Sequence, residues 1–291
     1  MKNIKFIILF VAALITLSDE AVAKSPVWKV SKADTHLFIG GTIHLLADKD
    51  YPLPEAFDLA FDQADEIVFE TDISKLNDLA TQMAMVPIIL SQNGESLESR
   101  LDPKTRGELT AFMEARGLPM SMFKPMTPAG FNLTLLTLEL QKMGISSESG
   151  VETFFNQKAI STGKTISWLE TLEAQLAALE KMNEVDANVM VKSTLQDIKN
   201  LPEKWPELLK LWRDGDMRGL EALAIDQILA SSPELYDALL IQRNKNWVPS
   251  IEKMLASQAT ELILVGALHL GGEHSLLKML STRGAKVEQL D

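Results

Sequence analysis

His44 and His269 each end the same short motif. In both places an apolar run is followed by Gly-x-x-His, in the segments Gly41–His44 and Gly266–His269. The glycine allows a sharp turn, which leaves each imidazole just past the end of a predicted strand. In an open α/β sheet, ligands bind outside the carboxyl ends of the strands. The repeated motif therefore favours a site, the alternative being two buried histidines satisfied by hydrogen bonds.

Two glutamates occupy the corresponding position after other strands. Glu70 follows the apolar run Ile67–Phe69, and Glu170 follows Ser167–Leu169. A carboxylate beside an apolar strand is costly to bury unless it is paired or bound to a metal. Imidazole and carboxylate together are ligands for Zn²⁺, Mn²⁺, Co²⁺ or Fe²⁺. For each glutamate alone, a helix-cap partner or a surface ion pair is the favoured interpretation, so only the group of four indicates a metal site.

Other polar residues are weaker candidates. Glu152 follows Gly150 at a predicted helix start, where a carboxylate also complements the helix dipole. Arg243 and Asn244 stand near the end of a predicted helix, and on sequence alone a solvated helix end is the favoured interpretation. His274 lies in a glycine-rich turn, where it is either a further ligand or an exposed loop residue.

These residues require a sheet to position them. Short apolar and β-branched runs predict six strands. They are Trp28–Lys32, His36–Gly40, Glu66–Glu70, Thr165–Trp168, Glu261–Val265 and Lys286–Leu290. His36 falls within the second strand, and we interpret it as structural. The last two strands flank a short helix from about residue 275 to 282, which predicts a βαβ unit and a parallel pair.

Helices fill the remaining sequence. Helix starts and stops predict helices over residues 54–64, 102–117, 127–144 and 150–162, because proline begins several of them and glycine ends most. Residues 170–256 form an almost wholly helical insertion, with breaks near Leu201-Pro202, Asp214-Gly215 and residues 231–233. The predicted class is therefore α/β (α+β): a sheet core with an active site at its strand ends and a large helical insertion.

Composition excludes several classes of protein. The 291 residues contain 28 Lys and Arg against 40 Asp and Glu, a net charge of −12. Such an acidic chain lacks the basic face of a nucleic-acid binder. The absence of cysteine excludes disulfides, thiolate metal sites and cysteine nucleophiles.

The first residues have the three parts of a secretory signal. Lys2 and Lys5 precede the apolar run Phe6–Leu17, and Ala21-Val22-Ala23 places small residues before the expected cleavage point. The run is short for a membrane span, so an uncleaved anchor is the less favoured interpretation. We expect residues 1–23 to be removed, leaving 24–291 as a single domain in the periplasm or outside the cell without a stable membrane anchor.

Short stretches across nearly the whole mature chain resemble the TraB/GumN family, whose animal relatives are the Tiki proteases. The matching stretches are Trp28-Lys-Val, Ile39-Gly-Gly-Thr-Ile-His44, Pro52-Leu-Pro54, Ile67-Val-Phe-Glu70, Gly150-Val-Glu152, Trp168-Leu-Glu170-Thr with Gln175-Leu, Arg243-Asn244 with Trp247, and Val265-Gly-Ala-Leu-His-Leu-Gly-Gly-Glu273. Two positions depart from the family pattern: Glu152 replaces the usual aspartate, and His274 stands where glycine is common.

The resemblance implies a metal-dependent hydrolase, most simply a peptidase, acting on a peptide or small-molecule substrate. His44, Glu70 and His269 would hold the metal. Glu170 or Glu152 would be the general base, and Arg243 with Asn244 would stabilise an oxyanion or orient the substrate. More distant relatives include erythromycin-esterase-like enzymes and a haem-binding lipoprotein group. The alternatives are therefore a non-catalytic haem- or metal-binding protein, or a regulator that sequesters a peptide. The sequence leaves the oligomeric state open.

Overall fold

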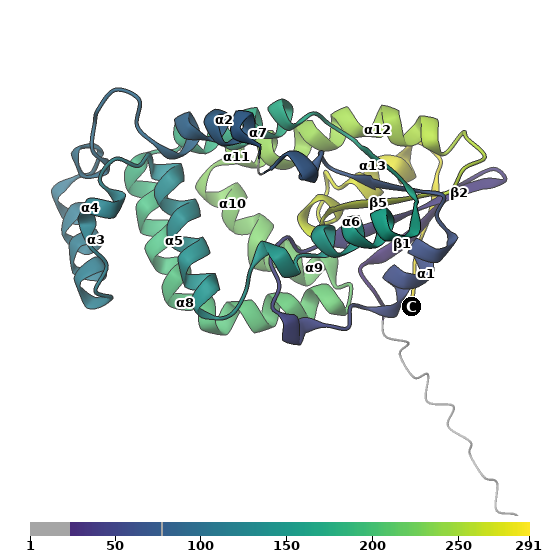
Figure 1. Ribbon diagram of the computed structural model, residues 1–291, viewed down its shortest axis with the longest axis horizontal. Helices are drawn as coiled ribbons and strands as arrows, with labels where there is room; N and C mark the ends of the chain where they lie inside the picture. Colours follow the sequence, from purple (N-terminus) through teal and green to yellow (C-terminus); the bar gives the residue numbers. More distant parts are fainter. Residues whose placement is uncertain (1–23, 77) are drawn as a thin grey trace, which may run out of the picture.

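The computed structural model describes residues 24–76 and 78–291, and the predicted signal peptide lies outside them (Figure 1). A six-stranded mixed sheet has the order β4-β3-β5-β2-β1-β6. Its strands are β1 (Val27–Lys32), β2 (Thr35–Thr42), β3 (Glu66–Phe69), β4 (Thr165–Trp168), β5 (Glu261–Gly266) and β6 (Lys286–Gln289). All six strands coincide closely with those predicted, and the mixed α/β class is confirmed.

Helices cover both faces of the sheet. Alternate side chains of β5 point to opposite faces, as the pleat of a strand requires. Leu262 and Leu264 belong to a core with α1 (Glu55–Gln63) and α6 (Val151–Thr162). Ile263 and Val265 belong to a second core with α12 (Gln242–Met254) and α13 (Leu276–Thr282). The two apolar cores fix the central strands, and with them the strand ends that carry the candidate residues.

A helical arm extends away from the sheet (Figure 1). One apolar cluster joins α3 (Pro103–Ala115), α5 (Pro128–Lys142) and the first half of α8 (Ala187–Arg213), so the arm draws on two separate segments of the chain. The insertion predicted over residues 170–256 therefore supplies only part of the arm, which also uses helices between β3 and α6. The last helix of the insertion, α12, packs on the sheet instead. The remaining helices are α2 (Leu79–Ile89), α4 (Met120–Phe123), α7 (Leu172–Glu180), α9 (Met217–Leu220), α10 (Asp226–Ser231) and α11 (Pro233–Tyr236).

Two predictions about the elements are wrong. The last two strands do not pair with each other: β6 pairs antiparallel with β1, while β5 pairs parallel with β2 and β3. The connection through α13 therefore passes over two strands, which a local βαβ pattern does not reveal. The predicted break at Leu201-Pro202 is also absent, because α8 continues through Pro202 and Pro206. Proline removes one helical hydrogen bond, but the apolar face of α8 continues beyond it to the buried Trp212.

Candidate active site

The four predicted strand-end residues meet at one edge of the sheet. Strands β2, β5, β3 and β4 are mutually parallel neighbours, so their carboxyl ends lie together. His44, His269, Glu70 and Glu170 follow these strands within three residues of their ends. The parallel register therefore brings together residues that are far apart in the sequence.

His44 is oriented by a carboxylate. Its Nδ1 lies 2.7 Å from Oε1 of Glu152, and the Thr42 hydroxyl donates a hydrogen bond to the same oxygen. The charge of Glu152 raises the pKa of His44 to about 9. Gly150, just before α6, permits this approach, because a Cβ there would lie 2.2 Å from the His44 carbonyl oxygen. The contact engages Nδ1 and leaves Nε2 of His44 on the side of Gly266.

Glu70 is buried and surrounded by donors. Its Oε1 accepts a 2.6 Å hydrogen bond from the Gly266 amide, while Oε2 accepts from Arg243 Nη2 at 2.5 Å and from Gln175 Nε2 at 3.2 Å. Burial alone would raise the pKa of this carboxyl, but the charges of Arg243 and His44 and the hydrogen bond from the Gly266 amide outweigh burial and hold the pKa below its ordinary value. Glu70 is therefore a fixed negative charge at neutral pH.

Arg243 joins the two buried glutamates. Its Nη2 donates to Glu70 and, at 2.6 Å, to Glu170 Oε1, while its Nε donates to the same Glu170 oxygen at 3.0 Å. Trp247 Nε1 donates to the other Glu170 oxygen at 3.0 Å. Burial raises the pKa of Glu170 despite these donors. The solvated-helix-end interpretation of Arg243 is wrong, because its side chain is only 12% exposed.

His269 is buried with both ring nitrogens engaged. Nδ1 lies 2.7 Å from Asn244 Oδ1, and Nε2 lies 3.1 Å from Arg243 Nη1. Asn244 Nδ2 donates to the backbone carbonyls of His269 and His274, so Asn244 Oδ1 is the acceptor for His269. Burial, reinforced by the Arg243 charge, lowers the pKa of His269 to about 3. The ring is therefore neutral, with the proton assigned to Nδ1 and the Nε2 lone pair facing Arg243.

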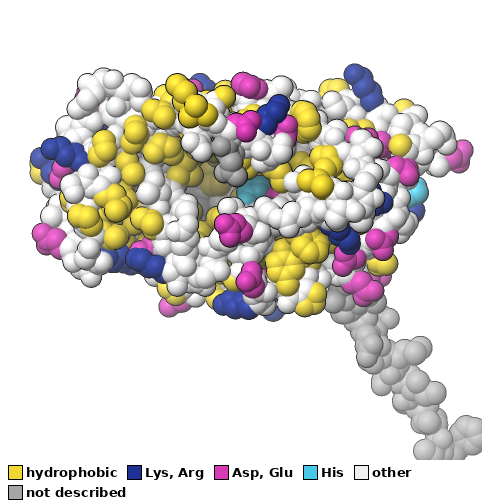
Figure 2. All heavy atoms as spheres, in the orientation of Figure 1, with side chains coloured by type: hydrophobic (Ala, Val, Ile, Leu, Met, Phe, Trp, Pro, Cys, Tyr) yellow, Lys and Arg dark blue, Asp and Glu magenta, His cyan; other side chains and the backbone are white. Residues whose placement is uncertain are grey.

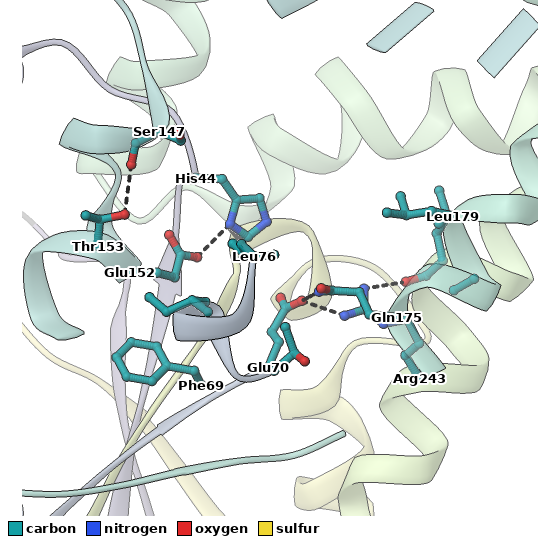
Figure 3. A pocket seen from close by; sticks show the side chains of 14 residues that line it. His44, Phe69, Glu70, Leu76, Ser147, Glu152, Thr153, Gln175, Leu179 and Arg243 are labelled. Carbon is teal, nitrogen blue, oxygen red and sulfur yellow. Dashed lines mark hydrogen bonds and ion pairs between the residues drawn. The ribbon is translucent and has the colours of Figure 1, made fainter. Parts of the chain in front are cut away.

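A cavity of about 310 Å³ opens beside these residues. Figure 3 shows His44 and Glu152 on one side of it, with Glu70, Gln175 and Arg243 on the other. Its other lining residues are Phe69, Thr71, Ile73, Leu76, Ser147, Thr153, Ala178, Leu179 and Leu239. In the space-filling view, hydrophobic side chains gather around a hollow (Figure 2). A small, partly apolar cavity with convergent polar groups is typical of a small-ligand site.

The donors around Gly266 partly fit a divalent cation. A Cβ at this glycine would lie 3.3 Å from both Glu70 Oε1 and His44 Nε2, so the two donors border one small space. His269 Nε2 is 3.7 Å from Glu70 Oε1 but faces Arg243. Within the described part of the chain, no three His, Asp or Glu side chains are arranged as a ready metal cluster. Of the three predicted metal ligands, His44 and Glu70 therefore border one space, whereas the Nε2 of His269 is engaged by Arg243.

The structure separates the other candidates. Of the two proposed bases, Glu152 lines the cavity, whereas Glu170 lies behind Arg243 and is not among the lining residues. His274 is exposed and takes part only through its backbone carbonyl, and His36 packs edge-on against Phe38.

Sequence reasoning missed several polar contacts of the site. Thr42, Gln175 and Trp247 each donate a hydrogen bond to a site carboxylate. Gln175 and Trp247 stand in stretches that carry the family resemblance, and this is the signal that could have identified them. Thr42 lies inside the first Gly-x-x-His motif, and the spacing of that motif does not show that its hydroxyl contacts Glu152.

Comparison with known proteins shows the family of the chain. The model of the TraB/PrgY/gumN family matches residues 26–289. The chain belongs to this family. Among curated relatives, the uncharacterized protein YbaP of Escherichia coli (strain K12) is 25% identical over 245 residues, which cover 84% of this chain and 88% of that protein. YbaP of Shigella flexneri matches with the same identity and coverage. No solved structure matches the chain.

Membership of the TraB/PrgY/gumN family confirms the resemblance seen in the sequence. The match extends over both Gly-x-x-His motifs and the segments that carry Glu70, Glu152 and Arg243. Across the described residues, no helix combines the length and apolar character that crossing a membrane requires.

Proposed function

We propose that this TraB/PrgY/gumN protein is a metal-dependent hydrolase that cleaves peptides at the strand-end cavity. One observation carries the proposal: His44 Nε2 and Glu70 Oε1 border the same space in front of Gly266. Metal-binding histidines characteristically give their other nitrogen to a carboxylate, which is the relation of His44 to Glu152. The charge of Glu70 would offset that of a bound cation.

His44 and Glu70 would hold the cation, with His269 as the third ligand candidate. A divalent Mn²⁺, Co²⁺, Zn²⁺ or Fe²⁺ ion held there supplies Lewis acidity, which polarises a carbonyl and lowers the pKa of water. Arg243 borders the cavity, and since its N–H groups are engaged by protein acceptors, it would stabilise negative charge on the substrate carbonyl oxygen through its positive charge. Asn244 acts through His269, whose ring it orients. Of the two candidate bases, the position of Glu152 on the cavity wall favours it over Glu170.

The haem-binding alternative has weaker support. A haem needs a broad apolar pocket lined by aromatic side chains. This cavity has a volume of about 310 Å³, near the lower limit for small-ligand sites, and Phe69 is the one Phe, Tyr or Trp among the described residues that line it. The peptide-sequestering alternative uses the same cavity without chemistry, and turnover distinguishes it from the hydrolase.

The test is peptide cleavage with and without chelator. Purified protein is incubated with a mixed peptide library in EDTA or in Mn²⁺, Co²⁺ or Zn²⁺, and products are identified by mass spectrometry. We expect cleavage only with metal, and its loss in His44→Ala. Cleavage that is indifferent to chelator would remove the metal from the proposal. Stoichiometric metal or peptide binding without products would favour a non-catalytic role.

We also propose that the protein acts in the periplasm or outside the cell. The proposal rests on the three-part pattern of residues 1–23. The acidic, cysteine-free composition agrees with folding without oxidative help.

A further inference from the structure

The cavity has two chemically different walls. One wall holds the charged and polar side chains described above. The other is apolar and comes from the segment around Ile73, from α7 and from the π-helical turn Asp237–Ile241. Its members are Ile73, Leu76, Ala178, Leu179 and Leu239. We propose that this apolar wall is a subsite for one large apolar side chain of the substrate, beside the amide that meets the polar wall. This inference rests on the proposed function.

The size and charge of the cavity favour this occupant. About 310 Å³ is at the lower limit of small-ligand cavities, which suits one side chain and its amide rather than a larger group. A charged side chain against the apolar wall would lose its hydration without gaining a partner. The substrate group at this wall is therefore apolar.

Exposed apolar residues also follow Leu76 along the chain. Leu76 lines the cavity and is 48% exposed, and Leu79, Met83 and Val86 are exposed on α2. These three α2 residues are spaced four and three apart, so they form one helical stripe. The helix from Leu79 to Ile89 contains no charged residue. Exposed apolar patches are typical of binding surfaces.

A binding experiment tests the subsite without relying on turnover. The probes are N-acetyl-leucinamide, N-acetyl-alaninamide and N-acetyl-glutaminamide, and binding to the metal-free protein is measured by ligand-observed NMR titration. We expect leucinamide to bind about tenfold more tightly than alaninamide, as an added apolar group in a fitting pocket produces. Glutaminamide should bind no better than alaninamide.

Leu76→Ser has a matched control in Leu59→Ser. Leu59 lies on α1, is 49% exposed and does not line the cavity. We expect Leu76→Ser to weaken leucinamide binding about fivefold and to leave alaninamide binding unchanged, while Leu59→Ser changes neither. Equal effects of the two variants, no preference for leucinamide, or no binding of any probe would overturn the subsite. Preferential leucinamide binding without peptide cleavage under any metal condition would support the subsite and refute the peptidase.

A second observation concerns Thr71. It is 3% exposed and lines the cavity beside Glu70, and its hydroxyl is buried without a hydrogen-bond partner among the described residues. Buried hydroxyls are nearly always satisfied, and an unsatisfied one destabilises the folded state. We infer that the Thr71 hydroxyl is a positioning group that gains its partner when a substrate amide enters the cavity.

Thr71→Val tests this role, because valine keeps the shape of threonine and removes the hydroxyl. We expect its thermal stability to equal or exceed that of the wild type, while N-acetyl-leucinamide binding weakens about threefold to tenfold, the effect of one hydrogen bond. Thr71→Ser should retain binding. Thr194→Val is the control, since Thr194 is 1% exposed but its hydroxyl donates to the Met190 carbonyl, and this variant should lose stability and keep binding. A Thr71→Val protein that behaves like Thr194→Val would make the hydroxyl structural and overturn the inference.

Discussion

Arg243→Met removes the one cation shared by Glu70 and Glu170. Their side chains are 6% and 8% exposed, so neither carboxylate gains full hydration when the guanidinium is lost. Breaking a buried ion pair in this way costs about 3–5 kcal/mol. Glu70 keeps the Gly266 and Gln175 donors and Glu170 keeps Trp247, which favours the lower part of the range. We therefore expect Arg243→Met to lose about 3 kcal/mol of unfolding free energy at pH 8.

The loss should shrink in acid. Without Arg243, the buried and like-charged pair raises the pKa of Glu170 further above its unfolded value. A carboxyl with a raised folded pKa binds more protons in the native state, so its destabilising effect appears as pH rises through that pKa and fades as pH falls. One unit of pKa shift corresponds to about 1.4 kcal/mol. The deficit at pH 5 should be at least about 1 kcal/mol smaller than at pH 8.

Urea unfolding followed by tryptophan fluorescence measures both quantities. Arg213→Met is the control, because Arg213 donates to the backbone carbonyls of Asp50 and Pro52. Its loss should cost about 1–2 kcal/mol and should be equal at the two pH values. The reasoning fails if Arg243→Met loses less than about 1 kcal/mol, or if its deficit does not change with pH.

Three further predictions follow from the site and the N-terminal segment. His44→Ala and Glu70→Gln should each lower Mn²⁺ affinity at least about tenfold, and wild-type affinity should fall from pH 7 to 5 because protons compete for the imidazole; unchanged calorimetric titrations would contradict this. In chelator, the free energy of unfolding should be greatest near pH ~6.5, the pKa of an unfolded histidine. Below this pH stability falls, because the unfolded chain protonates His269 while the folded protein keeps it neutral, and above it stability falls more weakly as folded, exposed His44 loses its proton. His269→Gln should therefore flatten the acid limb of a Tm profile against pH, and His44→Gln the alkaline limb. Intact-mass measurement of exported protein should give a chain that begins at Lys24, and a retained Met1 would contradict cleavage.

The sequence predicted the sheet better than its pairing. Local apolar runs locate each strand, because a strand must bury at least one face. Pairing depends on the whole fold: β5 and β6 are joined by one short helix, yet β2 and β1 lie between them in the sheet. In the same way, Pro202 disfavours a helix locally, but the packing of the α8 face on both sides of it overrides that preference.

The residues of the candidate site could be predicted from the sequence, but the hydrogen bonds and ion pairs among their side chains could not. The sequence places His44, Glu70 and His269 after apolar runs and so at strand ends, but the parallel pairing of β2, β5 and β3 that brings them together appears only in the structure. Arg243 lies on α12, far from both glutamates in the sequence. Nothing in local spacing shows that its guanidinium reaches Glu70 and Glu170. Side-chain reach across separate elements is a property of tertiary packing.

The place of β5 governs when the fold can form. This strand lies between β2 and β3, so Phe38 and Ile67 both pair opposite Leu262, near the far end of the chain. Until Glu261–Gly266 has been synthesised, the sheet consists of two unjoined pieces, β1 with β2 and β3 with β4. Contacts of such long sequence separation form slowly. A chain truncated before Glu261 therefore yields no smaller version of the site.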